Sequence, residues 1–170
     1  MTFALQTARL RLEACSAEFA QAACSDRRRA EGLCGLRLHP QWPEPDTLQA
    51  LASYARVLAK VPRLRGFGIW TLAYEGEVVG DAGFKGPPRM GEIELGYGIV
   101  PALRGRGLAT EAAAALCAWA ISQGVRAIHA RCEADNVSSL RVLSKLGMRA
   151  CGGGRYVLEA SVNPALHPAT

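Results

Sequence analysis

The stretch from residue 92 to residue 123 constrains the fold more than any other part of the chain, because its hydrophobic period changes within it. Residues 92–100 alternate between polar and apolar side chains, which is the period of a half-buried strand. Residues 109–123 are rich in alanine and place their larger apolar side chains in helical register, and Gly124 favours a helix end there. A strand that passes directly into a long helix excludes both an all-helical and an all-strand architecture.

The hydrophobic periods along the rest of the chain predict further strands and helices. Strands are expected at 8–13, 68–74, 78–85, 127–132, 148–151 and 155–162, and helices at 16–24, 47–59 and 138–146. Ser16 and Asp46 are the expected N-caps of the first two helices, and Gly147 is the expected C-cap of the last. The proline-rich stretch 39–46 excludes a helix interior. This order of elements predicts an α+β or mixed α/β fold.

The chain length of 170 residues fits one domain, which we place at 5–162, followed by a frayed tail at 163–170. A domain of this size buries about 70% of the surface of its unfolded chain, so neither a metal nor a disulfide is needed to hold it together. Hydrophobic residues make up 49% of the chain and charged residues 21%, which excludes a wholly disordered protein.

The net charge of +5 suits an anionic ligand but falls short of a polybasic segment. The run 27–29 consists of three arginines, yet no nucleic-acid reading motif accompanies it, so no stable nucleic-acid partner is expected. The longest apolar run, 112–121, is too short to span a membrane, and no secretory signal is visible. The six cysteines form no C-x-x-C pair, which predicts reduced, mostly buried thiols in the cytoplasm and no metal site.

The turn between the strand at 92–100 and the following helix carries the strongest indication of chemistry. Gly105 and Gly107 allow backbone amides to approach a ligand closely, and the helix start presents unpaired N–H groups with the positive end of the helix dipole. Together with Arg104 and Arg106, these groups predict a site for a phosphate or a pyrophosphate. The alternative is a tight turn in which the glycines serve backbone geometry only.

The residues of this turn also carry a resemblance to a known family. Arg104-x-x-Gly107-x-Ala109 resembles the Q/R-x-x-G-x-G/A acyl-coenzyme A loop of the GNAT N-acetyltransferases. Three further motifs occur in the order of that family: E-I-E-L-G-Y at 92–97, A-T-E-A at 109–112 and N-V-S-S-L-R-V-L-S-K-L-G-M at 136–148. The set resembles the branch of the ribosomal-protein alanine and serine N-acetyltransferases, over residues 5–160.

The resemblance implies a mostly antiparallel, twisted sheet that is splayed at an acetyl-CoA site and flanked by helices. It implies that the turn holds the pyrophosphate of acetyl-CoA, and that the edge of the preceding strand pairs with the pantetheine amides. The residues that it places at the cofactor are Ile99, Val100, Arg104, Gly105, Arg106, Gly107, Leu108, Ala109, Thr110, Asn136 and Ser139. For Asn136 and Ser138 the alternative is helix capping, which needs no cofactor.

The reaction implied by the resemblance is the attack of a neutral amine on a thioester, which requires a proton acceptor. Glu94 occupies the family's position for a general base, and Glu92 shares its strand face and could raise its pKa toward neutrality. The alternative is that both carboxylates simply face solvent. Where the family often carries a tyrosine acid, this chain has Leu143, so Tyr97 or Tyr156 could substitute, although core packing explains either one.

The acceptor is expected to bind against the variable segment 33–46, with Trp42 between prolines as a flat apolar wall. The resemblance implies a primary amine as acceptor, either a protein N-terminus or a small molecule, and acetyl-CoA as co-substrate without a metal. A second hypothesis is a non-catalytic acyl-CoA sensor or scaffold of the same fold, which Leu143 motivates. No membrane partner is expected, and the chain is expected to be a monomer or a homodimer.

Overall fold

Residues 3–160 are described by a computed structural model; the expected tail at 163–170 and residues 161–162 of the expected domain lie outside them. The strands are β1 (Ala4–Gln6), β2 (Arg11–Ala14), β3 (Arg37–Leu38), β4 (Ile69–Tyr74), β5 (Glu77–Phe84), β6 (Glu92–Ile99), β7 (Ala127–Arg131), β8 (Arg149–Gly152) and β9 (Arg155–Glu159). The α-helices are α1 (Ala17–Ser25), α2 (Arg27–Cys34), α3 (Pro45–Lys60), α4 (Leu108–Ser122) and α5 (Val137–Lys145), and two 3-10 turns lie at η1 (Pro62–Leu64) and η2 (Pro101–Leu103).

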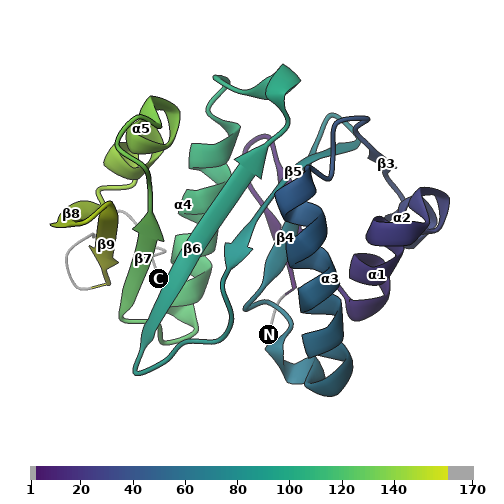
Figure 1. Ribbon diagram of the computed structural model, residues 1–170, viewed down its shortest axis with the longest axis horizontal. Coiled ribbons are helices and arrows are strands. Elements are labelled where there is room, and N and C mark those ends of the chain that lie inside the picture. The colour runs from purple at the N-terminus through teal and green to yellow at the C-terminus, as the bar shows by residue number, and fades with distance from the viewer. Residues whose placement is uncertain (1–2, 161–170) are drawn as a thin grey trace.

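All of these strands belong to one sheet, in the order β1-β2-β4-β5-β6-β7-β9-β8, with β3 paired to β5 outside this path. The pairs β6–β7 and β3–β5 are parallel, and the other pairs are antiparallel. In Figure 1, α3 crosses one face of the sheet over β4 and β5, while α4 lies behind β6 on the other face. The fold is therefore mixed α/β, as the order of elements predicts, and its sheet is mostly antiparallel and open, as the family resemblance implies.

Two hydrophobic cores hold the layers together, one on each face of the sheet. On the α4 face, the ring of Trp119 meets Trp70 at 5.2 Å, Phe67 at 5.3 Å and Phe84 at 6.0 Å between centroids. On the other face, Trp42 packs in a second core that α1, α3 and β5 build. Aromatic contacts of this kind fix α4, and with it the turn at its N-terminus, relative to the central strands.

Several helix ends confirm the predictions, and one contradicts them. The Ser16 side chain accepts the N–H of Phe19 at 3.0 Å, as an N-cap does. Gly124 and Gly147 follow α4 and α5 with positive φ angles of 87° and 73°. The prediction that Asp46 caps α3 is wrong, because the helix begins at Pro45, whose ring fixes a helical φ at the first position, and Asp46 lies inside the first turn.

Two segments differ from the elements expected at the N-terminal side. The strand expected at 8–13 begins only at Arg11, as β2, and the unexpected strand β1 precedes it; the two are joined by a turn in which Thr7 N–H donates to Leu10 O at 2.9 Å. Residues 27–34, to which the sequence assigned no element, form α2. Asp26 caps this helix by accepting the N–H of Arg29, and Gly35 ends it in the left-handed conformation.

Residues 3–160 show the burial of the cysteines, the clustering of metal-ligating side chains and the apolar character of the helices. Cys15, Cys117 and Cys132 are buried, whereas Cys24 and Cys151 are exposed, so burial holds for half of the six thiols. Within this part of the chain, no cluster of three or more His, Cys, Asp or Glu side chains is arranged to hold a metal. Nor does any helix there combine the length and the apolar character that a membrane crossing requires.

Candidate acyl-donor and acceptor sites

Strands β6 and β7 part from each other halfway along β6. They pair only over Glu92–Glu94 and Ala127–His129, and in Figure 1 they diverge beyond that point. The N–H of Lys85 donates to Glu94 O, and the N–H of Val100 donates to Val79 O, both at 2.9 Å, so β6 stays paired with β5. Because backbone groups of a strand alternate in direction, those of Tyr97 and Ile99 point toward the gap. This free strand edge can pair with an extended ligand that carries amides.

The turn after β6 presents a series of free backbone donors. Gly105 and Gly107 have φ angles of 80° and 79°, and Gly107 precedes α4 without any side-chain cap. From Gly105 to Thr110, no backbone N–H group has an acceptor among residues 3–160. Consecutive free N–H groups at a helix N-terminus bind phosphates, because the donors converge and the helix dipole adds positive potential. The turn therefore fits a diphosphate.

The two arginines of the turn differ in what their side chains contact. Arg104 donates from Nε to Ile99 O at 2.8 Å and from Nη2 to both carboxylate oxygens of Glu44 at 2.9 and 3.1 Å. Its charge thus ties the end of β6 to the start of α3. The exposed side chain of Arg106 has no polar partner among the described residues. Of the two charges expected at the anion site, only that of Arg106 is free to reach it.

The expected contact of Val100 with the cofactor needs correction. Val100 is 1% exposed, its N–H donates to Val79 O, and its carbonyl accepts the N–H of Leu103 at 3.0 Å. It offers no free donor, because the end of β6 stays paired with β5 and runs straight into the 3-10 turn. The strand edge that remains available consists of the backbone groups of Tyr97 and the N–H of Ile99, since Ile99 O already accepts from Arg104 Nε.

A residue near the N-terminus braces the turn. Arg9, in the connection between β1 and β2, donates from Nη1 to Arg106 O at 2.9 Å and from Nε to Glu111 Oε2 at 2.7 Å. The hydroxyl of Thr7 donates to Glu111 Oε1 at 2.6 Å. Burial alone would raise the pKa of Glu111, but the hydrogen bonds from Thr7 and Arg9 outweigh it and hold that pKa below its ordinary value.

Replacing Glu111 with glutamine should lower the free energy of unfolding by about 1–2 kcal/mol near pH 7, because charge-assisted hydrogen bonds are lost. Since the folded-state pKa lies below the unfolded-state value of about 4.3, the carboxylate stabilises fully above that value and loses its effect as pH falls through the folded-state pKa. Urea unfolding at several pH values measures this. A difference between wild type and variant that stayed constant on acidification would contradict the linkage.

The far side of the gap is formed by the first turn of α5. Asn136 Oδ1 accepts the N–H of Ser139 at 3.0 Å, so Asn136 caps this helix, which is the alternative that the sequence left open. Ser139 Oγ lies 2.7 Å from the hydroxyl of Tyr97, which reaches across from β6. Burial raises the pKa of Tyr97, and the hydrogen bond with Ser139 opposes this rise in part. One turn further along α5, Leu143 is 1% exposed and lies in the core.

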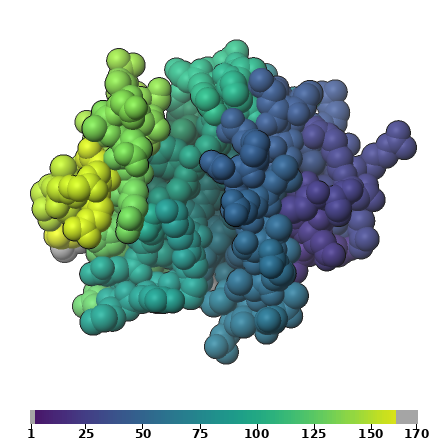
Figure 2. Space-filling view, viewed as in Figure 1, coloured from purple at the N-terminus to yellow at the C-terminus, as the bar shows by residue number. Residues whose placement is uncertain are grey.

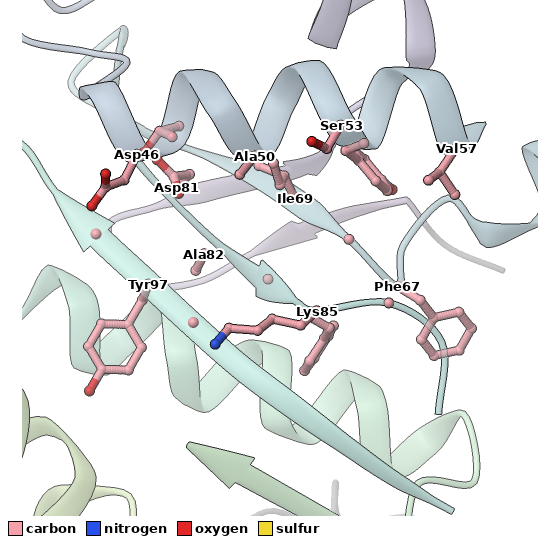
Figure 3. A pocket seen from close by; sticks show the side chains of 18 of the residues that line it. Asp46, Ala50, Ser53, Val57, Phe67, Ile69, Asp81, Ala82, Lys85 and Tyr97 are labelled. Atoms are coloured by element: carbon pink, nitrogen blue, oxygen red, sulfur yellow. Dashed lines mark hydrogen bonds between the residues drawn. The ribbon is translucent and has the colours of Figure 1, made fainter. Parts of the chain in front are cut away.

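On the opposite face of β6, a groove of about 840 Å³ lies between α3 and strands β4 to β6. Figure 2 shows this recess between α3 and β6, and Figure 3 shows its lining. Asp46, Ser53 and Val57 of α3 form one wall, and the floor carries Asp81 of β5 and Lys85, the residue that follows β5. The ring of Tyr97 extends away from α3 in Figure 3, so β6 separates the groove from the phenol.

Glu94 lies where the pairing of β6 with β7 ends, on the groove face of β6. Its Oε1 contacts Lys85 Nζ at 2.5 Å and Arg131 Nε at 3.7 Å, and its side chain is 25% exposed. Glu92 instead pairs with His129 Nε2 at 3.0 Å. The two carboxylates thus have separate side-chain partners, whereas the sequence suggested that they would act on each other.

The expectation that Trp42 forms an apolar wall of the acceptor site is corrected by its burial. The side chain is 2% exposed, and its ring stacks on Phe19 at a centroid distance of 6.3 Å. The indole N–H donates to Asp81 Oδ1 at 2.9 Å. Flanking prolines restrict the backbone but do not decide exposure, and here the ring fills the core under α1. Trp42 therefore does not line the groove, and its link to the groove is the hydrogen bond to Asp81.

Comparisons with known proteins agree with this architecture. Residues 9–149 match the family model of the acetyltransferase (GNAT) domain. The chain is 35% identical over 147 residues to the uncharacterized N-acetyltransferase YjdG of Bacillus subtilis (strain 168), covering 84% of this chain and 88% of that protein.

Two solved structures share the fold at lower identity. RimJ of Mycobacterium smegmatis, in complex with CoA-disulfide, has a TM-score of 0.66 at 19% identity, over 91% of this chain and 84% of that one. The ribosomal-protein-S5-alanine acetyltransferase of Vibrio fischeri has a TM-score of 0.66 at 15% identity, over 95% and 98% of the two chains.

Proposed function

The chain belongs to the GNAT acetyltransferase family, and on that premise we propose that it moves the acetyl group of acetyl-CoA to a primary amine by direct attack. One observation supports the proposal: three features meet at β6. They are the unpaired backbone N–H groups of residues 105–110, the edge of β6 that is not paired with β7, and the groove over the face of β6 that Gly96 and Gly98 line. An acyl donor and an acceptor would thus meet at one strand from opposite sides.

The residues fit acetyl-CoA through backbone groups. The amides from Gly105 to Thr110 would hold the pyrophosphate, with Arg106 adding charge. The edge of β6 at Tyr97 and Ile99 would pair with the pantetheine amides. When bound, acetyl-CoA would supply the thioester carbonyl, and a backbone N–H of this edge would polarise it.

Glu94 is the proposed proton acceptor for the amine. By strand alternation it shares a face of β6 with Gly96 and Gly98, whose backbone lines the groove. An alkyl ammonium must lose a proton before it can act as a nucleophile, and a carboxylate within reach or linked by one water can take it. The ion pair with Lys85 must open for this, so Lys85 would hold Glu94 in place until an amine arrives.

Tyr97 is the proposed proton donor to the leaving thiolate. Leu143 leaves α5 without a phenol at the family's usual position, but the hydroxyl of Tyr97 lies against the first turn of the same helix through Ser139. It reaches the gap between β6 and α5 from the opposite wall. A phenol kept protonated by burial and hydrogen-bonded to a hydroxyl can donate a proton there.

The variant Tyr97→Phe should lower kcat by about tenfold, less than the loss of a typical general acid, because a thiol of pKa about 8.5 leaves without much assistance. Stopped-flow release of free thiol measures the rate. Tyr74→Phe, which changes another half-buried tyrosine at the end of β4, serves as the control and should leave kcat within about twofold. An unchanged rate in Tyr97→Phe would remove Tyr97 from the mechanism.

The proposed function itself is tested by thiol release from acetyl-CoA with a panel of primary amines and N-terminal peptides. Acetylated product and free CoA in equal amounts are the expected result. Calorimetric binding of acetyl-CoA without release of thiol on any amine would support the acyl-CoA sensor instead. Absence of both binding and release would reject both functions.

A further inference from the structure

The floor of the groove is bare where β6 crosses it. An added Cβ at Gly96 or Gly98 would meet no atom within 4 Å, and neither residue has a positive φ. Neither packing nor backbone conformation therefore requires glycine at these positions. At Gly83, by contrast, a Cβ would lie 2.0 Å from Gly68 O, so packing alone explains that glycine. The space over Gly96 and Gly98 is room for a ligand that lies directly on the strand.

Asp81 stands beside this floor, opposite Gly98 in the β5–β6 register. Its Oδ1 accepts two hydrogen bonds, from Trp42 Nε1 and from Thr47 Oγ1, each at 2.9 Å. Its Oδ2 has no hydrogen-bond partner within residues 3–160, and Figure 3 places the side chain in the groove lining. Burial raises the pKa of Asp81, while these two hydrogen bonds act in the opposite direction. A half-satisfied carboxylate in such a place favours a cationic partner.

The two cationic side chains that line the groove are paired with other carboxylates, so neither neutralises the charge of Asp81. Glu44 is paired with Arg104, and Lys85 is paired with Glu94. Asp46 has no cationic side-chain partner in the described part of the chain, but it lies in the first turn of α3, where the helix dipole favours a negative charge. The groove thus carries uncompensated negative charge in a protein whose net charge is +5.

We infer that the acceptor is a primary amine that carries a second cationic group, and that Asp81 binds this second group over the bare floor of Gly96 and Gly98. The inference rests on the proposed function and names the chemistry of its acceptor. Gly98 lies four positions along β6 from Glu94, about 13 Å at a rise of about 3.3 Å per residue. A flexible chain with a nitrogen at each end can therefore present one nitrogen for transfer and leave the other at Asp81.

The test compares acceptors that differ only in the second charge. With the full chain, kcat/KM is measured for 1,6-diaminohexane against hexylamine, and for a tripeptide with lysine at its second position against one with alanine there. The wild type should prefer the dication by at least tenfold in one of the two pairs, which also identifies whether the source is a free diamine or a peptide N-terminus. Equal values in both pairs would overturn the inference.

The variant Asp81→Asn keeps the shape and the acceptor oxygen for Trp42 and Thr47 but removes the charge. It should reduce the preference for the dication to within about twofold. Glu18→Gln removes an exposed carboxylate of α1, which pairs with Arg29, and should leave the preference intact. If Asp81→Asn unfolds, as a thermal melt would show, Asp81→Ser is the second neutral variant. A preference that survives in the folded variant would exclude Asp81 as its cause.

A binding measurement separates this inference from the proposed function. Titration of 1,6-diaminohexane or the lysine tripeptide into the protein with CoA should show at least tenfold weaker binding in Asp81→Asn than in wild type. If no amine is acetylated but this difference appears, the proposed transfer fails and the cation site stands. If neither dication binds the wild type more tightly than its matched monocation, the cation site fails whatever the activity.

Discussion

Replacing Glu94 with glutamine should lower kcat for amine acetylation at neutral pH by about 10²- to 10⁴-fold, the usual contribution of a general base. Glutamine keeps the shape and most of the hydrogen bonding of the side chain but cannot accept the proton of an ammonium. The affinity for acetyl-CoA should barely change, because the donor is expected to contact β6 through backbone groups. The rate of the variant should recover in part at high pH, where the amine loses its proton in bulk water.

The structure supplies a matched control for this experiment. Glu77 also lies on a strand, is paired with Arg37 at 2.9 Å, and is 27% exposed compared with 25% for Glu94. Glu77→Gln thus removes an equivalent ion pair far along β5 and should leave kcat unchanged. Glu111→Gln is unsuitable, because Glu111 holds Arg9 against the turn at residue 106. If kcat of Glu94→Gln stays within about twofold of wild type, Glu94 is not the base and positioning must account for the rate.

The role of Glu94 depends on strand register, which the pattern of alternation alone could not fix. A slip of one residue would turn its side chain to the α4 face. The register Phe84↔Leu95 and Gly83↔Gly96 excludes this slip, because it sets Lys85 opposite Glu94 on the groove face. The apolar residues Ile93 and Leu95 are correspondingly buried on the other face. Sequence alternation therefore gave the right face, and pairing with β5 explains why.

The elements that the sequence predicted well are those with strong local signals. Ser16 caps α1 and Gly124 follows α4 as expected, because capping chemistry acts over three or four residues. Helix α2 was not predicted, since the run 27–34 is highly charged and contains a glycine. It is stabilised by distant contacts instead: Arg27 donates to the carbonyls of Leu38 and Trp42. Tertiary contacts of this kind override weak propensity and leave no local pattern.

The residues of the candidate site likewise fall into those with a local sequence signal and those without one. The turn at 104–110 is visible in the sequence because its glycines and the following helix are consecutive. Arg9 and Glu44, which brace it, lie 97 and 60 residues away from Arg106 and Arg104, so spacing gives no indication of them. The sequence predicts no role for Asp81, because a single carboxylate in an apolar strand forms no motif. Its significance comes from Trp42 and Thr47, which the fold brings to one of its oxygens.

The variant Gly107→Val should weaken the binding of acetyl-CoA by more than tenfold, about 1.4 kcal/mol or more. Two effects add in this variant. An added Cβ at residue 107 would lie 3.5 Å from Arg9 Nη2, so the branched valine side chain would crowd the arginine that braces the turn through Arg106 O. The φ of Gly107 is 79°, a left-handed conformation that is strongly unfavourable for a β-branched residue. Valine would therefore shift the backbone of the turn, and its N–H groups would no longer point toward one position. Calorimetric titration with acetyl-CoA measures the loss.

The effect of backbone strain in Gly107→Val must be separated from the loss of the diphosphate site. A glycine at the other end of α4 provides the control. Gly124 has a φ of 87°, and an added Cβ there would meet no atom within 4 Å, so Gly124→Val imposes the same kind of strain without touching the turn. Both variants should lose similar amounts of stability in urea unfolding, but only Gly107→Val should lose acetyl-CoA affinity. An affinity that fell equally in both would indicate a general weakening of α4. An affinity unchanged in Gly107→Val would mean that the diphosphate binds elsewhere, because its proposed site depends on the left-handed conformation of Gly107.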